Sequence, residues 1–295
     1  MSVIPGWYPV TTTYEPDSSS FARCPADPSL YRYFHQWPKH PSPRRASLET
    51  VFPDEIVTER LRLVRLCREN VPTTTLYRHM RADAPHIGEI SEYVMWDPHE
   101  TPKDTHDYLR DVERQWDDHE QATYAIYARG EREKEGGSED ERDVSTAERT
   151  RSGGLETGGV EFRDGSDVVG DGRGGVGGDA DELAGTTNLH FDWDRRSAEL
   201  GIWLRKPFWG RGYSGERAAA LLELAFDRLD LEVVGASHQD GNEQSRRAIE
   251  KYVERFGGQY DGLLRNFAPK GDEVRDLHRY TISKEQYQNA VEQDK

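Results

Sequence analysis

Residues 199–229, ELGIWLRKPFWGRGYSGERAAALLELAFDRL, decide the fold of this chain. Over 199–205 apolar residues alternate with other residues, which is the two-residue period of a half-buried strand. Pro207 and a run of glycines then interrupt the pattern. Apolar residues return at helical spacing from Ala218 to Leu229. The stretch therefore predicts a strand, a glycine-rich turn and a helix, in that order.

The glycine-rich turn has more than one interpretation. It would at least join the strand to the helix. The glycines at 210–215 also fit the spacing G-x-G-x-x-G of dinucleotide-binding folds. That fold is disfavoured, because Glu199 lies in the preceding strand and too few residues follow Glu232 to complete such a sheet. A third interpretation is an anion site, since a helix start presents unpaired N–H groups, and Arg211 and Arg217 add positive charge.

The same residues resemble a known family. Glu-Leu-Gly-Ile-Trp-Leu, followed by Trp-Gly-Arg-Gly-Tyr-Ser-x-Glu, resembles the pyrophosphate-binding motif of GNAT-fold N-acetyltransferases. The wider family pattern is Gln/Arg-x-x-Gly-x-Gly/Ala; here Trp209 and Ser214 replace its first and last residues, and Gly212 is kept. These departures resemble the RimJ/RimL branch, as does Thr-Glu-Arg-Leu-Arg-Leu at 58–63. The resemblance covers about residues 55–129 and 182–285.

The resemblance implies an α+β (mixed α/β) GNAT fold. We expect a central, mostly antiparallel twisted sheet of about seven strands flanked by helices, with the fourth and fifth strands parallel and splayed apart. The sequence patterns predict strands over 56–67, 122–129, 183–191, 198–204, 233–238, 259–266 and 274–282. Besides the helix after the glycine turn, they predict helices over 74–81, 101–118 and 242–256.

Two segments lie outside the resemblance. Residues 1–50 form a predicted extension that is rich in proline and aromatic residues, which is either loosely ordered or packed on the domain or a partner. Residues 130–181 are dominated by Gly, Asp, Glu and Arg, and we expect a disordered insertion. Its aspartates match neither an EF-hand loop nor a nonapeptide calcium repeat. The acetyltransferase domain is thus predicted to comprise 51–129 and 182–295.

The composition excludes some classes of function. The net charge of −16 argues against nucleic-acid binding, which needs a basic face. Lys supplies only 8 of the 39 basic residues, and an acidic, lysine-poor chain is typical of salt-loving microbes. Two cysteines, Cys24 and Cys67, are too few for a disulfide framework and indicate a cytoplasmic location. No apolar run approaches a membrane span, and we see no signal-peptide pattern.

The resemblance also implies how acetyl-CoA would bind. Its diphosphate would lie on the amides of 211–215, and its pantetheine would pair with the strand edge at 201–204. A backbone N–H near Trp203 would donate to the thioester oxygen. The expected coenzyme-binding residues are Ile202, Trp203, Leu204, Trp209, Gly210, Arg211, Gly212, Tyr213, Ser214, Gly215 and Asn242.

Two residues are candidates for catalysis. Glu199, on the fourth strand, would accept the proton of the amine; its alternative is an exposed carboxylate paired with an arginine. Ser245 would protonate the departing thiolate, while Asn242 contacts pantetheine; alternatively both residues only begin a helix. Some relatives use a glutamate on the sixth strand, where this chain has Ala268. The histidines have no ligand spacing, so no metal is expected.

The function implied is transfer of acetyl from acetyl-CoA to a primary amine, for example the N-terminal amine of a protein. Alternatives are the same fold acting on a small amine or antibiotic, and a catalytically silent module that binds CoA or a partner. The partners expected are acetyl-CoA and an amine acceptor, with the chain as a monomer or homodimer. The acceptor itself has no recognisable sequence motif.

Overall fold

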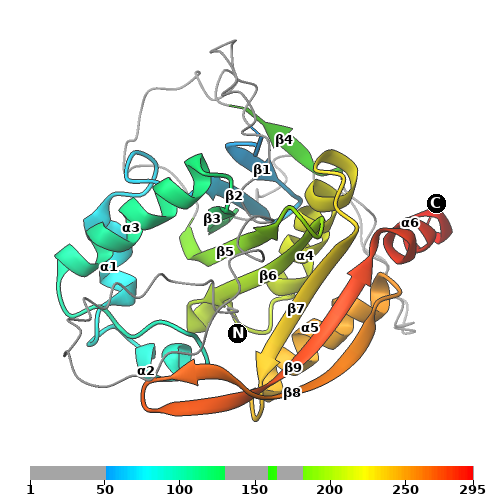
Figure 1. Cartoon of the computed structure of the whole chain (residues 1–295). Helices are drawn as coiled ribbons and strands as arrows, with labels where there is room; N and C mark the ends of the chain where they lie inside the picture. Colours follow the sequence, from blue (N-terminus) through cyan, green and yellow to red (C-terminus); the bar gives the residue numbers. More distant parts are fainter. Residues whose placement is uncertain (1–50, 130–158, 165–181, 295) are drawn as a thin grey trace, which may run out of the picture. The chain divides into compact units, whose positions relative to one another are not determined.

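The computed structural model describes residues 51–129, 159–164 and 182–294. The predicted extension 1–50 and most of the predicted insertion 130–181 lie outside the described residues. The described strands form one mixed sheet in the order β4-β1-β2-β3-β5-β6-β7-β9-β8, with helices packed against it (Figure 1). None of the helices in these ranges is long and apolar enough to cross a membrane.

The described residues form nine strands and six α-helices. The strands are β1 (Glu55–Val57), β2 (Leu61–Arg65), β3 (Gln121–Ala128), β4 (Glu161–Arg163), β5 (Glu182–Asp192), β6 (Ser197–Leu204), β7 (Val233–Gln239), β8 (Gln259–Lys270) and β9 (Glu273–Ser283). The helices are α1 (Thr73–Met80), α2 (Ile87–Ser91), α3 (Pro102–Asp117), α4 (Tyr213–Glu223), α5 (Glu243–Arg255) and α6 (Lys284–Gln293). A 3-10 turn (Lys206–Phe208) precedes α4, and a π-helical turn (Leu224–Arg228) extends it.

The mixed α+β architecture is confirmed, but the described sheet has nine strands instead of about seven. One extra strand arises because the predicted first strand turns after Val57. The Thr58 hydroxyl donates to the Leu61 carbonyl (3.2 Å) and accepts from the Leu61 amide (3.1 Å), which stabilises that turn. The sequence pattern 56–67 therefore contains two antiparallel strands, β1 and β2.

The other extra strand, β4, falls inside the tract predicted to be a disordered insertion. Glu161–Arg163 pair antiparallel with β1 and form an edge of the sheet. Arg163 makes an ion pair with Glu55 of β1 (3.3 Å), and the Phe162 ring lies 4.2 Å from the Arg228 guanidinium. These contacts give three residues of an otherwise polar tract enough partners to order as a strand.

Apolar side chains cover both faces of the sheet. On one face, Leu200, Ile202 and Leu204 of β6 pack with residues of α4 and α5. On the other face, Trp203 packs with residues of α1 and α3. The two-residue period predicted for β6 thus separates its side chains between two cores.

The parallel pair β6–β7 opens partway along its length. Its register runs from Ser197 opposite Val233 to Leu200 opposite Ala236, although β6 continues to Leu204 and β7 to Gln239. The other edge of β6 stays paired with β5 as far as Leu204. The predicted splay is therefore confirmed, and it begins directly after Leu200.

Most predicted helices are present within two residues of their expected bounds. At α3, Asp104 accepts from the Thr101 amide (2.8 Å), as the N-cap pattern predicts. Two helices were not predicted, α2 and α6. A capping box at Ser283 and Gln286 begins α6 directly at the end of β9, where the sequence analysis followed only the strand pattern.

Candidate functional site

The glycine-rich turn leads from β6 into α4 by way of two left-handed residues. Gly210 has φ 75° and Gly212, the N-cap of α4, has φ 81°. Residues with a Cβ adopt this conformation at a cost of about 1–2 kcal/mol. The Trp209 indole N–H donates to the Leu204 carbonyl (2.7 Å), which fixes the turn against the end of β6. Gly215 lies inside α4, where a Cβ would meet open space.

The β1–β2 turn holds the first turn of α4. The Glu216 carboxylate accepts from the Thr58 hydroxyl (2.6 Å), the Arg60 amide (2.7 Å) and the Arg60 Nε (2.7 Å). Arg60 Nη1 also donates to the Arg211 carbonyl (3.0 Å). In α4 the Gly215 amide bonds back to the Gly212 carbonyl (3.1 Å), so the amides of Tyr213 and Ser214 stand at the helix start. Amides arranged in this way at a helix start suit an anion.

A cavity of about 1180 Å³ opens over this turn, between α4 and α5. Its apolar lining includes Leu200, Ile202 and Leu204, the β6 side chains that face these helices. Its charged lining is mainly basic, although the whole chain carries −16. The basic residues are Arg60, Arg217, Arg247, Lys251 and Arg255, against the acidic Glu216 and Asp294. The cavity therefore combines an apolar wall with a basic one.

Most of the expected coenzyme-binding residues line this cavity. They are Ile202, Leu204, Trp209, Gly210, Gly212, Tyr213, Ser214 and Gly215. Trp203 instead packs edge-on against Trp96 on the opposite face, with ring centroids 5.8 Å apart, and is not among the lining residues. Arg211 is outside the lining, and its guanidinium lies 5.4 Å from the Phe208 ring.

Asn242 and Ser245 lie together at the start of α5. The Ser245 amide donates to Asn242 Oδ1 (3.0 Å), which caps the helix. Ser245 lines the cavity, while Asn242 lines an adjoining one of about 310 Å³ beside α2. Asn242 Nδ2 and Ser245 Oγ are buried and have no hydrogen-bond partner among the described residues. Both residues thus cap the helix and still keep a polar atom for a ligand.

Glu199 lies on the sheet face opposite Leu200 and is not in the lining of the 1180 Å³ cavity. Its carboxylate forms an ion pair with Arg279 of β9 and covers Gly235 of β7, where a Cβ would overlap it. Burial raises the pKa of Glu199 to about 7, although the Arg279 charge acts in the opposite direction. The structure thus shows the arginine pairing considered from sequence, together with a carboxyl group that exchanges protons near neutral pH. The aligned Ala268 is buried on β8.

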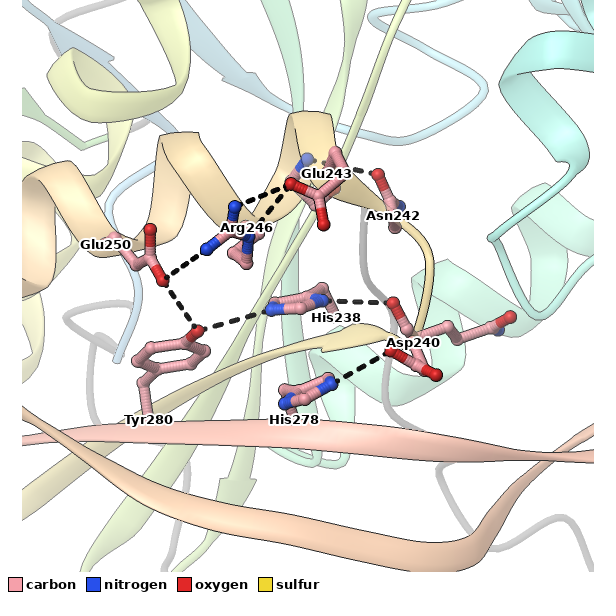
Figure 2. Close-up of polar contacts among 10 residues, drawn as sticks. His238, Asp240, Asn242, Glu243, Arg246, Glu250, His278 and Tyr280 are labelled. Atoms are coloured by element: carbon pink, nitrogen blue, oxygen red, sulfur yellow. Dashed lines mark hydrogen bonds and ion pairs between the residues drawn. The ribbon is translucent and has the colours of Figure 1, made fainter.

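Two histidines that looked scattered in the sequence meet across β7 and β9. The rings of His238 and His278 stack with centroids 4.7 Å apart (Figure 2). His238 Nε2 lies 3.3 Å from the Tyr280 hydroxyl, which donates to Glu250 (3.4 Å), and His278 Nε2 lies 3.2 Å from Asp240. No group of His, Cys, Asp or Glu in the described ranges is arranged to hold a metal.

The sequence analysis missed several residues of the cavity. Arg60 is distant in the chain, and only the fold brings it to the α4 start. Arg247 and Lys251 are spaced i, i+4 on one face of the predicted helix 242–256, and this spacing could have indicated a basic face beside Ser245. Tyr252 packs in the core and also lines the cavity.

Comparison with known proteins shows similarity to acetyltransferases. Residues 168–252 match the family model described as "Acetyltransferase (GNAT) domain". The chain is 32% identical over 107 residues to "Putative ribosomal N-acetyltransferase YdaF" of Bacillus subtilis (strain 168), covering 36% of this chain and 56% of that protein. It is 26% identical over 110 residues to "Uncharacterized N-acetyltransferase p20" of Bacillus licheniformis, covering 37% and 60%. The chain thus spans less than two thirds of these curated relatives.

Solved structures share the fold at low sequence identity. RimJ of Mycobacterium smegmatis, in complex with CoA-disulfide, has a TM-score of 0.54 and 13% identity, over 82% of this chain and 96% of that one. A GCN5-related N-acetyltransferase from Brucella melitensis has a TM-score of 0.54 and 14% identity, over 86% of both chains. Residues 168–252 thus match the GNAT acetyltransferase domain, and the fold that the chain shares with these structures, including the splayed parallel strands and the left-handed glycine turn, is the GNAT fold.

Proposed function

We propose that this protein transfers an acetyl group from acetyl-CoA to a primary amine. The observation that carries the proposal is the 1180 Å³ cavity, which combines the left-handed glycine turn at the α4 start with a basic lining in an acidic chain. A coenzyme with a diphosphate, a further phosphate and an apolar arm fits such a lining. Helix-start amides and arginines supply the hydrogen bonds that phosphates accept.

The residues of the cavity would divide the binding of acetyl-CoA between them. The amides of Tyr213 and Ser214 would face the diphosphate. The edge of β6 beyond Leu200, which β7 leaves open, would pair with the amide groups of the pantetheine arm. The backbone N–H near Trp203 would donate to the thioester oxygen, and one donor of this type is typically worth about 3–4 kcal/mol in the transition state.

Two side chains would move protons during the transfer. The amine nitrogen forms its bond to the thioester carbon as the carbon–sulfur bond breaks. Glu199 would accept the amine proton through water, since its carboxylate is outside the cavity lining and its Oε2 has no partner among the described residues. Ser245 Oγ, buried and likewise without a partner in that part of the chain, would protonate the sulfur.

We propose a protein N-terminal amine as the acceptor. The relatives whose printed names include "ribosomal N-acetyltransferase" and "RimJ" support this choice. The smaller cavity beside α2 also supports a cationic acceptor, because three carboxylates, Glu89, Glu92 and Glu243, line it against one cation, Arg247, although Lys206 already pairs with Glu89 and Arg246 with Glu243. We further propose a cytoplasmic location, in keeping with Cys67, which is a free thiol.

Calorimetric titration with acetyl-CoA tests the proposal, combined with thiol release against N-terminal peptides, polyamines and aminoglycosides. Saturable binding and turnover with the peptides would support it. Turnover with polyamines or aminoglycosides but not with peptides would show that the acceptor is a small amine instead of a protein N-terminus. Binding without turnover on any amine would indicate a silent CoA-binding module, and no binding of acetyl-CoA would refute the function.

A further inference from the structure

Arg217 of α4 is a buried cation in the wall of the cavity. Only 1% of its surface is exposed, and it is the bulkiest fully buried side chain of the described residues. Its Nε and Nη1 atoms have no hydrogen-bond partner within these ranges. Buried polar groups in proteins are nearly always paired, so a guanidinium in this state requires an explanation.

Neighbouring acidic groups do not compensate this charge. The carboxylates of the cavity lining serve other arginines: Glu216 pairs with Arg60 (2.7 Å) and Asp294 with Arg255 (3.9 Å). Tyr252 makes a side-chain hydrogen bond with Arg217, and its ring lies 5.9 Å from the guanidinium. That phenol stays neutral, because burial raises the pKa of Tyr252 to about 12. Arg217 itself keeps its proton at physiological pH, as arginines in proteins do.

The position of Arg217 indicates where its partner belongs. Helical side chains lean toward the helix N-terminus, so Arg217 covers the turn formed by Tyr213 and Ser214. All three residues line the same cavity. The unpaired amides of Tyr213 and Ser214, the positive end of the helix dipole and the Arg217 guanidinium therefore lie together in the wall of the cavity. An anion bound there would meet all three donors.

We propose that Arg217 is an anion receptor, whose Nε and Nη1 have no partner among the described residues and whose charge no acidic group there compensates, and that it binds the diphosphate of the acyl donor. The inference rests on the proposed function and adds to it a side chain that no motif assigns. Its consequence concerns stability as well as affinity. The free protein would carry an uncompensated buried charge, and binding of the diphosphate would compensate it. Coenzyme binding and fold stability would thus be coupled through one residue.

The test compares wild-type protein with Arg217→Met, which keeps most of the apolar volume and removes the charge. Arg247→Met is the matched control, because Arg247 is an exposed cation of the same cavity. Urea unfolding without ligand measures stability. Calorimetry measures affinity for acetyl-CoA, for its analogue without the 3′-phosphate and for inorganic pyrophosphate. Arg217→Lys keeps a charge and loses the planar fork.

We expect Arg217→Met to unfold at a higher urea concentration than the wild type, and to lose about 30-fold or more in affinity for all three ligands. Arg247→Met should leave the unfolding midpoint unchanged, and Arg217→Lys should fall between wild type and Arg217→Met in affinity. Equal loss with and without the 3′-phosphate would assign Arg217 to the diphosphate. A loss confined to the 3′-phosphorylated coenzyme would overturn that assignment.

Other outcomes separate this inference from the proposed function. If Arg217→Met unfolds earlier than the wild type, or does not fold, the guanidinium is structural and the inference is wrong. If Arg217→Met binds acetyl-CoA and pyrophosphate as the wild type does, the function stands and the inference fails. If the wild type binds pyrophosphate through Arg217 but not acetyl-CoA, the anion receptor stands and the proposed function fails. Wild-type protein that binds neither refutes both.

Discussion

Glu199 of β6 and Arg279 of β9 form an ion pair across β7, and the Glu199 carboxylate lies over Gly235, where a Cβ would overlap it. The two strands are not neighbours, because β7 pairs with both. The pairing therefore depends on a glycine in the strand between them. It places a buried carboxylate with a pKa of about 7 beneath the start of the β6–β7 splay.

The first prediction concerns the pH dependence of activity. If Glu199 is the base, kcat/KM should rise with pH and level off above about 7, where the carboxyl is ionised. Glu199→Gln should abolish this rise and lower kcat by about 100-fold or more. Arg279→Met should move the inflection to higher pH, because Arg279 opposes the effect of burial on this pKa. An unchanged profile in Glu199→Gln would exclude the residue as base.

The same carboxyl predicts a pH dependence of stability. Its folded-state pKa lies above the ordinary value of 4.5, so the folded protein binds this proton more tightly than the unfolded chain does. Raising the pH from 4.5 through 7 should therefore reduce the free energy of unfolding, by about 3 kcal/mol for this group. Urea unfolding at pH 5 and 8 measures the change. Glu199→Gln should show a correspondingly smaller difference between the two pH values.

The third prediction separates strain from binding at the glycine turn. Gly212→Asp places a Cβ at φ 81° and a negative charge at the proposed diphosphate site. Gly257→Asp, after α5 and outside the cavity lining, places the same side chain at φ 67°. Both should lose about 1–2 kcal/mol of stability through backbone strain. Only Gly212→Asp should lose affinity for acetyl-CoA, and equal affinity in the two variants would refute the assignment of the turn.

Much of this site could be predicted from the alternation of apolar with other residues over 199–205. That pattern predicts that Glu199 and Leu200 face opposite sides of the sheet, as the structure shows. The glycine turn and the helix after it were likewise predicted from local sequence. The sequence could not show that Arg60, on the β1–β2 turn, would hold Glu216, because that contact joins segments 156 residues apart. It also gave no sign that Arg217, on a helix with small apolar neighbours, would be buried with its Nε and Nη1 unpaired among the described residues.

The missed elements have local causes. The short helix α2 spans five residues, includes Gly88 and has no N-cap hydrogen bond, so its sequence carries little helical signal. The strand β4 depends on β1 for its pairing, and a three-residue segment in a glycine-rich tract carries no period of its own. Such elements form through tertiary contacts, which a single sequence does not show.

The fourth prediction tests the two roles of Asn242. Asn242→Asp keeps an oxygen that accepts from the Ser245 amide, so α5 should retain its cap and the protein its stability. It removes the Nδ2 donor proposed for the pantetheine arm, so affinity for acetyl-CoA should fall by roughly tenfold, the value of one hydrogen bond. Asn242→Ala should lose both the affinity and about 1 kcal/mol of stability. Unchanged affinity in Asn242→Asp would leave Asn242 as a helix cap only.

The last prediction concerns salt, and it follows from the excess of carboxylates. The chain has 55 acidic and 39 basic residues, so its mean electrostatic interaction is repulsive. Exposed ion pairs such as Arg114–Asp118 weaken in salt, but such pairs contribute only about 0.3–0.5 kcal/mol each. Screening of the net repulsion should therefore dominate, and the urea midpoint should rise between about 0.1 and 2 M KCl. Sucrose at matched osmolality does not screen charge and serves as the control. An equal rise in sucrose, or full stability in dilute buffer, would contradict the salt adaptation inferred from the lysine-poor composition.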